Sequence, residues 1–257
     1  MLIGSHPEVE GIGEVNAFER RLWPEVSSLH HCSCGQVFAD CDFWRGVLNP
    51  IDTGNGNIAI NSELLDQFEI ANHKLFRQVL SVSGKSVVCD SSKDVHRLKK
   101  ILACPSFNPV VVYLVRDPRA VAYSMVRKGE RVGESGRKKY QFLQGIKMWR
   151  NLQSFMLENI DELKCPHITI RYEDLVSNTE AYMNQVFRIA GLKKHVGDLQ
   201  NFESPVHYIE GNRIRFNKNH KLCIDAEFQS ALSDENWIQG TELAKPFLSQ
   251  FGYPTKR

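Results

Sequence analysis

The stretch that most constrains this chain is residues 110–116, an apolar run that ends abruptly at Arg116. Its β-branched and aromatic residues are typical of a buried strand. Asp117 and Pro118 follow at once, and these residue types suit the N-cap and first position of a helix. The pattern therefore predicts a strand that passes directly into a helix, with Arg116 at the junction. In parallel sheets ligands bind at this edge, and helix N-termini attract anions.

The same alternation of strand and helix repeats along the chain. Two further apolar runs, residues 86–90 and 167–172, read as buried strands, and helical patterns separate all three. This order predicts an α/β fold with three layers, a parallel sheet flanked by helices. We find no linker, so residues 1–257 are expected to form a single domain. Within it, residues 197–234 have no clean period and are expected to form an irregular, lid-like excursion.

Two of the predicted helices carry specific expectations. A long helix is predicted over about residues 137–163, because its apolar residues recur at spacings of three and four. Its apolar stripe is Phe142, Ile146, Trp149, Leu152, Met156, Ile160 and Leu163. A last helix, from Trp237 to Phe251, is expected to be kinked or broken near Pro246.

Composition excludes several classes of protein. The chain has 257 residues, of which 42% are hydrophobic and 24% charged, and its formal net charge is +2. This charge balance gives no argument for nucleic-acid or membrane-surface binding, and the apolar runs are too short to span a bilayer. Seven scattered cysteines, an odd number, are typical of reduced thiols. We therefore expect a cytoplasmic protein with no membrane segment.

A second junction between strand and loop lies at residues 87–93, Val-Val-Cys-Asp-Ser-Ser-Lys. It places Lys93 near the sheet edge that also holds Arg116. A lysine there can stabilise negative charge on a leaving oxygen. In the alternative interpretation, Ser91 or Ser92 caps the next helix and Lys93 is solvated. This motif alone leaves both interpretations open.

The string Ser-Gly-Lys-Ser at residues 83–86 mimics the end of a Walker A nucleotide-binding loop. No glycine stands five residues before Gly84, and the string precedes a predicted strand, whereas a Walker A loop follows one. We interpret the string as the turn into that strand. A kinase or another P-loop nucleotidase is therefore disfavoured.

Two strings carry a resemblance to the PAPS-dependent sulfotransferases, whose sulfuryl donor PAPS is phosphoadenosine phosphosulfate. In that family an arginine closes a strand and a serine follows eight residues on, as Arg116 and Ser124 do here. An Arg-Tyr-Glu-Asp-Leu string also closes a strand, as residues 171–175 do. The chain resembles bacterial members related to tyrosylprotein and carbohydrate sulfotransferases. The resemblance implies a fold like that of P-loop nucleotide kinases, a ribose phosphate held by Arg116 and Ser124, assistance from Lys128, and Tyr172 against the nucleotide.

The resemblance extends to the beginning of the chain. Residues 6–14 are similar to a family segment in which a His-Pro-x-Val string leads to Gly-Glu. In the tyrosylprotein branch that glutamate is the catalytic base. The resemblance thus implies that Glu14 takes the proton of the acceptor and that Lys93 stabilises charge on the leaving phosphate. His6 is the alternative base, because cytosolic sulfotransferases use a histidine.

A basic loop late in the chain is also similar to the family. Residues 211–215, Gly-Asn-Arg-Ile-Arg, match a Gly-Asn-x-x-Arg string in a flap that closes over the nucleotide. The resemblance implies that Arg215 is a second phosphate ligand. A charged loop is otherwise simply solvated.

One element of the family has no counterpart here. Members begin with a strand and a loop such as Arg-Ser-Gly-Thr, whose amides and basic side chain cradle the phosphosulfate. Residues 2–7 resemble the segment just after that loop. We therefore expect the first strand and the phosphosulfate loop to be missing from this sequence, a start codon that lies further upstream, and poor activity for the polypeptide as given.

Three cysteines near the beginning have metal-like spacing. Cys32, Cys34 and Cys41, with His30 and His31 adjacent, offer the ligand types of a tetrahedral zinc site. The spacing is not one of the standard paired patterns. The favoured interpretation is small thiols packed in the core, and no metal is expected.

The function expected from these motifs is sulfuryl transfer from PAPS to the hydroxyl of an acceptor, by in-line displacement analogous to phosphoryl transfer. The acceptor is a carbohydrate, a tyrosyl group or a small alcohol. The alternative is a non-catalytic relative that binds a nucleotide or sulfate, because the phosphosulfate loop is absent. Variable loops build acceptor pockets, so the sequence does not choose among acceptors.

Overall fold

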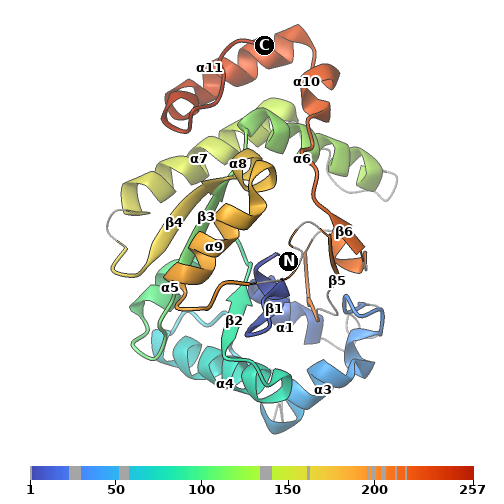
Figure 1. Cartoon of the computed structure of the whole chain (residues 1–257), viewed down its shortest axis with the longest axis vertical. Helices are drawn as coiled ribbons and strands as arrows, with labels where there is room; N and C mark the ends of the chain where they lie inside the picture. Colours follow the sequence, from blue (N-terminus) through green and yellow to red (C-terminus); the bar gives the residue numbers. More distant parts are fainter. Residues whose placement is uncertain are drawn as a thin grey trace. The chain divides into compact units, whose positions relative to one another are not determined.

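The computed structural model describes residues 2–22, 30–51, 58–133, 141–160, 163–195, 197, 199, 201–203, 207–211, 213–217 and 219–257. The chain divides into two compact units, and each is described by itself. The first unit comprises Met1–Val110 and Met183–Leu222, and the second comprises Val111–Tyr182 and Cys223–Arg257. The helix α9 (Thr179–Ile189) runs from the second unit into the first (Figure 1).

The first unit is built around one parallel strand pair. Its helices and strands are η1 (Ile3–Ser5), β1 (Val9–Gly13), η2 (Val15–Ala17), α1 (Phe18–Leu22), η3 (Phe38–Asp40), α3 (Asp42–Leu48), η4 (Asn49–Ile51), α4 (Leu65–Ser83), β2 (Val87–Asp90), α5 (Val95–Ala103), β5 (Asn201–Glu203), η5 (Arg213–Phe216) and β6 (Asn219–Lys221). β1 and β2 pair in parallel with Val9 opposite Val87, and β5 and β6 pair antiparallel. β2 confirms one of the strands that the sequence predicts.

β1 is buried along its whole length, although the sequence analysis did not predict it as a strand. Its sequence, Val-Glu-Gly-Ile-Gly, contains two glycines and a glutamate, so it lacks the apolar run that marks the other buried strands. The burial of Glu10 is tolerated because Lys85 Nζ lies 2.8 Å from its carboxylate. Gly84, with φ +68°, ends α4 in the left-handed conformation that glycine favours. The Ser-Gly-Lys-Ser string is therefore the turn into β2, as predicted.

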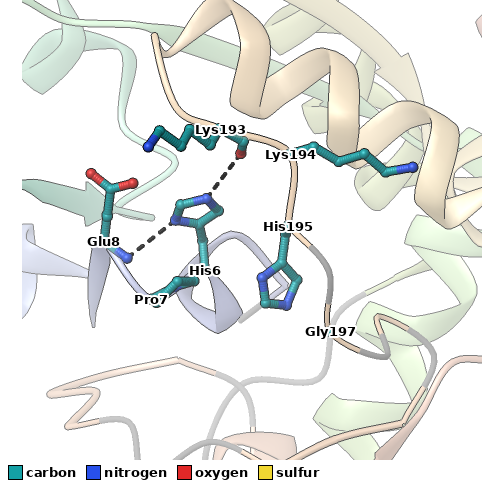
Figure 2. Close-up of a pocket in the computed structure, with 7 residues that line it drawn as sticks. All are labelled: His6, Pro7, Glu8, Lys193, Lys194, His195 and Gly197. Carbon is teal, nitrogen blue, oxygen red and sulfur yellow. Dashed lines mark hydrogen bonds between the residues drawn. The ribbon is translucent and has the colours of Figure 1, made fainter.

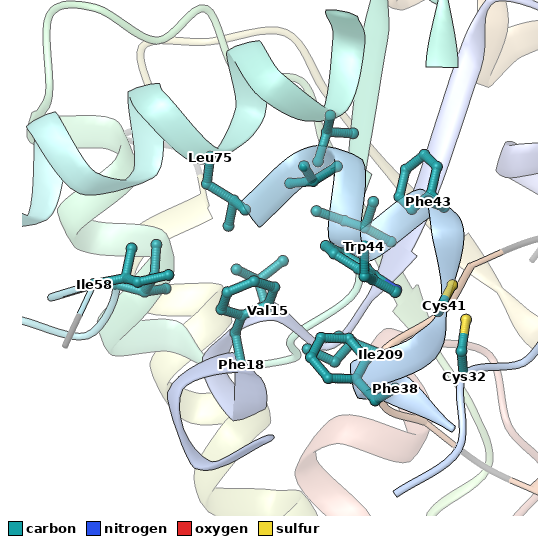
Figure 3. Close-up of a cluster of buried hydrophobic side chains, with 14 of the residues drawn as sticks. Val15, Phe18, Cys32, Phe38, Cys41, Phe43, Trp44, Ile58, Leu75 and Ile209 are labelled. Atoms are coloured by element: carbon teal, nitrogen blue, oxygen red, sulfur yellow. The ribbon is translucent and has the colours of Figure 1, made fainter. Parts of the chain in front are cut away.

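The core of the first unit lies between α3, α4 and the segment that follows β1 (Figure 3). Its largest side chain, Trp44, is fully buried and contacts Phe18 and Phe38 edge-on or tilted. Leu75 and Val79 are buried on the apolar face that α4 turns towards this core.

Tyr208 packs tightly against β1. A Cβ atom added at Gly11 would lie 2.6 Å from Tyr208 Cε1 and 2.7 Å from its hydroxyl oxygen. Gly11 therefore lets a buried aromatic ring approach the strand more closely than any other residue would.

Gly11→Ala is expected to lower the free energy of unfolding by about 1–3 kcal/mol, because the new methyl group overpacks this contact. Urea unfolding followed by circular dichroism measures the loss. Gly46→Ala is the matched control, since its new methyl would meet the two methyl groups of the Val82 side chain at 3.3 and 3.5 Å. Equal stability of the two variants would contradict the close contact.

The second unit is built around another parallel strand pair. Its elements are β3 (Val111–Val115), α6 (Pro118–Gly133), α7 (Phe142–Ile160), β4 (His167–Arg171), α8 (Tyr172–Ser177), α10 (Glu227–Ala231) and α11 (Asp234–Gln250). Val111 lies opposite His167 and Val115 opposite Arg171, without a register shift. The two predicted strands and the predicted strand-to-helix junctions after them are confirmed, and the parallel pairs of both units agree with an α/β fold.

α6 and α7 pack at a close approach that depends on Gly145. A Cβ atom there would lie 3.0 Å from the Cα of Ala122. The long helix begins and ends inside the range that the sequence predicts, but two members of its predicted apolar stripe are wrong. Leu163 lies beyond the end of α7 at Ile160. Leu152 is exposed, and Gln153 is buried in its place because its amide oxygen accepts a hydrogen bond from the hydroxyl of Tyr113.

The end of the chain differs from the expectation at Pro246. α11 continues through this proline as one helix, so the predicted break is absent. Within residues 197–234, the expected irregular excursion, the described residues include the short elements β5, η5, β6 and α10. Among the described residues, no helix has the length and apolar character needed to cross a lipid bilayer.

Candidate functional site

One group of candidate residues, in the first unit, lies where β1 ends. The pairing of β1 with β2 shifts register between Gly11 and Gly13, and Gly13 has φ +83°. A Cβ atom at Gly13 would lie 2.5 Å from the carbonyl oxygen of Glu210, so only glycine fits there. The next residue, Glu14, donates its backbone N–H to the same carbonyl at 3.4 Å. The segment around Glu210 thus fixes the turn that presents Glu14.

The loop after β2 is organised by Asp90. One oxygen of its carboxylate accepts hydrogen bonds from the N–H and hydroxyl of Ser92, and the other accepts from Arg97 Nε at 2.7 Å. Ser92 Oγ in turn accepts from the N–H of Asn16 at 3.1 Å. This network ties the loop after β2 to the loop after β1.

Lys93 completes this group of residues. Its backbone has φ +55°, a left-handed conformation that is uncommon for a residue with a side chain and is found where function requires it. Its Nζ lies 2.7 Å from Oε1 of Glu14, with side-chain exposures of 65% for Lys93 and 23% for Glu14. The two predicted catalytic residues are therefore in direct contact. Asp94 caps α5, so the alternative caps Ser91 and Ser92 are wrong.

A second group of candidate residues, in the second unit, is centred on Arg116 at the end of β3. The indole of Trp149 donates a hydrogen bond to the carbonyl of Arg116 at 3.0 Å. The guanidinium lies 4.6 Å from the centre of the Tyr172 ring. Its Nη2 lies 3.1 Å from the carbonyl oxygen and 3.2 Å from the carboxylate of Asp225. Its Nε is buried and has no hydrogen-bond partner among the residues that the structure describes.

Asp117 is not the partner of Arg116, although it is the next residue. Its carboxylate caps α6 by accepting from the N–H of Arg119 at 2.8 Å, as the N-cap prediction requires. The same carboxylate pairs with the Arg119 side chain at 2.7 Å. The guanidinium of Arg116 therefore contacts Tyr172 and Asp225 instead of Asp117.

Tyr172 begins α8, directly after β4. Its hydroxyl donates to the carbonyl of Cys223 at 3.1 Å. Glu173 holds the turn, since its carboxylate accepts from the N–H of Asp117 at 3.2 Å and from the hydroxyl of Tyr253 at 2.9 Å. Asp174 lies 3.6 Å from Arg171. Glu173 therefore holds the turn, and Asp174 pairs with Arg171.

Acidic and basic side chains that the sequence analysis missed surround Arg116. Arg127 pairs with Glu227 and lies 3.9 Å from Asp225. The hydroxyl of Tyr123 donates to Glu227 at 2.8 Å, and this hydrogen bond raises the pKa of Tyr123. No local sequence pattern around residues 225–227 predicts that Asp225 and Glu227 belong to this cluster, because only the tertiary fold brings them near Arg116.

The remaining predicted nucleotide ligands take different positions. Ser124 lies half-buried on α6, and no hydrogen bond joins it to Arg116 among the described residues. The backbone of Lys128 continues α6, but its side chain lies outside the described residues. Arg215 belongs to the first unit, where it is buried and donates to the carbonyls of Gly211 and His31 at 2.9 and 3.3 Å. Within the described part of the chain, the buried Nε of Arg215 has no hydrogen-bond partner.

His6 lines a separate pocket of about 390 Å³, with Lys193, Lys194 and His195 (Figure 2). Its Nδ1 accepts from the N–H of Glu8 and its Nε2 faces the carbonyl of Lys193, both at 3.1 Å. Because both ring nitrogens are engaged by the backbone, this histidine is a poor candidate for the alternative base. Burial, with a smaller contribution from His6, lowers the pKa of His195.

Comparisons with known proteins indicate the family and the fold of the chain. A family model described as "Sulfotransferase family" matches residues 2–195. The sulfotransferase domain from the curacin biosynthetic pathway superposes with a TM-score of 0.58 and 15% identity, over 98% of this chain and 92% of that one. The sulfotransferase domain from the Synechococcus PCC 7002 olefin synthase gives 0.50 and 15%, over 94% and 95%. No curated protein sequence matches the chain. At this identity the structural likeness shows a shared fold.

Proposed function

Because the chain belongs to the sulfotransferase family, we propose that it moves a sulfuryl group from PAPS to the hydroxyl of an acceptor. The observation that carries this proposal is the contact between Glu14 and Lys93 at 2.7 Å. A carboxylate and an ammonium group there offer a base for a hydroxyl proton and a cation for a leaving oxygen. Both residues follow the carboxyl ends of parallel strands, where ligands bind in α/β folds.

The donor fits the chemistry of the Arg116 cluster. The Nε of Arg116 is buried and has no partner in the described ranges, so this arginine can donate one further hydrogen bond. Its planar guanidinium suits a phosphate group, which it can contact with two N–H groups at once. Tyr172, already stacked on this guanidinium, offers an aromatic face for the nucleotide. Ser124, Lys128 and Arg215 are proposed to assist at the phosphate.

The proposed reaction is a single in-line displacement. The acceptor oxygen forms a bond to sulfur while the bond from sulfur to the bridging phosphate oxygen breaks, and phosphoadenosine phosphate (PAP) leaves. The proton of the acceptor passes to the carboxylate of Glu14, and Lys93 stabilises the charge that grows on the leaving oxygen. Positioning and charge stabilisation supply the catalysis, as in phosphoryl transfer.

Binding of the desulfated nucleotide PAP tests the proposal. We expect PAP to raise the melting midpoint of the chain, since it binds the folded state only. Arg116→Ala is expected to weaken PAP binding by about 10- to 150-fold, which corresponds to the 1.5–3 kcal/mol of a charged hydrogen bond. Arg188→Ala, at an exposed arginine on α9, is the matched control and should bind PAP normally.

Transfer of labelled sulfate from PAPS to a panel of sugars, phenols and alkyl alcohols then identifies the acceptor class. A well-folded chain whose melting midpoint does not respond to PAP would contradict the donor. PAP binding that survives unchanged in Arg116→Ala would contradict the role of this arginine. PAP binding without transfer to any panel member or to water would favour the non-catalytic alternative.

A further inference from the structure

Three cysteines and one histidine of the first unit converge at the edge of its core. Cys32 and Cys41 are fully buried, with their sulfur atoms side by side (Figure 3), and Cys34 and His207 are half-buried. The Sγ atoms and the ring nitrogen of His207 all lie within 4.8 Å of one another. His207 follows Cys41 by 166 residues, so only the fold brings it to the thiols.

The distances between these atoms match the edges of a tetrahedral coordination shell. Cys34 Sγ lies 3.7 Å from Cys41 Sγ, and His207 Nδ1 lies 3.6 Å from Cys32 Sγ and 3.3 Å from Cys41 Sγ. Tetrahedral zinc, with bonds of about 2.3 Å to sulfur and 2.0–2.1 Å to nitrogen, separates neighbouring sulfurs by roughly 3.8 Å and a sulfur from a nitrogen by roughly 3.5 Å. The four groups are therefore spaced for one metal ion.

A tight turn prearranges the first two thiols. The N–H of Cys32 donates to the carbonyl of Gln36 and the N–H of Gly35 donates to the carbonyl of Cys32, both at 2.9 Å. Gly35 has φ +94°, which closes the turn in a conformation that glycine favours. An antiparallel bridge between His31 and Val37 flanks it. The two thiols thus emerge from one rigid loop.

The imidazole of His207 is also held in place. Its ring stacks on Phe43, with ring centres 4.5 Å apart and planes 7° from parallel. The indole of Trp44 donates to the carbonyl of His207 at 3.0 Å. These contacts, both from α3, direct Nδ1 towards the thiols. A ring fixed in this way loses little freedom when it binds a metal.

We propose that Cys32, Cys34, Cys41 and His207 bind one Zn²⁺ ion in a structural site. Thiolate and imidazole ligands are the set that zinc prefers, and four protein ligands leave no open position for a substrate. The sequence analysis favoured simple packing of the thiols and named His30 and His31 as the nearby imidazoles. The fourth ligand is instead a distant histidine.

The proposed metal fastens the segment around His207 to the rest of the first unit. Two residues after His207, the N–H of Ile209 donates to the carbonyl of Ile12 at 3.1 Å, beside the end of β1. Arg215 donates to the carbonyl of His31, next to Cys32. The metal therefore stabilises the turn at the end of β1, independently of any activity.

Metal analysis of the whole purified chain tests the proposal. We expect one zinc ion per chain after dialysis, and a lower melting midpoint when a strong chelator removes it. Replacement of zinc by Co²⁺ is expected to give the visible absorption bands of tetrahedral cobalt together with thiolate-to-cobalt charge transfer. These readouts need neither donor nor acceptor.

Variants separate the ligands from the other cysteines. Cys34→Ser and His207→Gln, at the two half-buried ligands, are expected to lower zinc affinity by more than about 100-fold, the upper range for losing an outer-shell partner. Cys165→Ser, at a half-buried thiol in the second unit, is the matched control and should keep its zinc. A folded wild-type chain without zinc or tetrahedral cobalt bands would overturn the proposal, as would a native Cys34–Cys41 disulfide found by mass spectrometry.

Discussion

Arg119→Met is expected to lower the free energy of unfolding by about 3–5 kcal/mol, the cost of breaking a buried ion pair. Arg119 is 0% exposed, and its guanidinium makes two contacts with the carboxylate of Asp117, at 2.7 and 3.0 Å. It also donates to the carbonyl of Pro254 and lies 4.1 Å from the centre of the Trp237 ring. Methionine keeps most of the volume but leaves the carboxylate of Asp117 buried and uncompensated.

Urea unfolding measures this loss, with Lys245→Met as the matched control. Lys245 pairs with Glu242 on the exposed face of α11, so its removal should change stability by less than about 1 kcal/mol. The double variant with Asp117→Asn removes the orphaned charge but keeps the helix cap, and it should recover part of the loss. A loss in Arg119→Met no larger than that of the control would mean that the buried pair contributes little.

Glu14→Gln is expected to reduce the rate of sulfuryl transfer by about 10²- to 10⁴-fold, the usual contribution of a general base. Glutamine has the same shape and its amide oxygen can still accept from Lys93 Nζ, but it cannot take the proton of an acceptor. The stabilisation by PAP should remain, because the Arg116 cluster is untouched. Labelled transfer to the alcohol that the wild-type chain sulfates measures the rate.

Glu8→Gln is the control for this experiment, since Glu8 is exposed just before β1. The effect of Glu14→Gln should also shrink for acidic phenols, whose proton leaves more readily than that of an alkyl alcohol. Undiminished turnover in Glu14→Gln would remove Glu14 from the mechanism. An equal loss for all acceptors would indicate a positioning role.

Local signals predicted much of the fold. The strands β2, β3 and β4 were recognised because each is a short apolar run, and Asp117 was recognised as a cap because capping involves only neighbouring residues. β1 was missed because Gly11 and Gly13 break its pattern. Glycine is required at these two positions because Tyr208 packs against Gly11 and Glu210 against Gly13, and both contacts come from about 200 residues away in sequence.

The candidate site was predictable in its residue types but not in its contacts. Glu14 and Lys93 were named from a family resemblance, and their contact follows from the two parallel strands that carry them. The left-handed backbone of Lys93 has no signal in its sequence, since glycine or asparagine usually marks that conformation. Asp225 and His207 reach their partners only through tertiary structure, which no local pattern encodes.

The first unit is made from two stretches of chain, residues 1–110 and 183–222, that are separated by most of the second unit. During synthesis, the hydrogen bond from the N–H of Ile209 to the carbonyl of Ile12 cannot form until the ribosome has added Ile209. The second unit is likewise completed only by residues 223–257. Neither unit can therefore finish folding as an independent early domain. Each unit therefore completes its fold only after the chain has left it and returned, which ties the folding of the two units together.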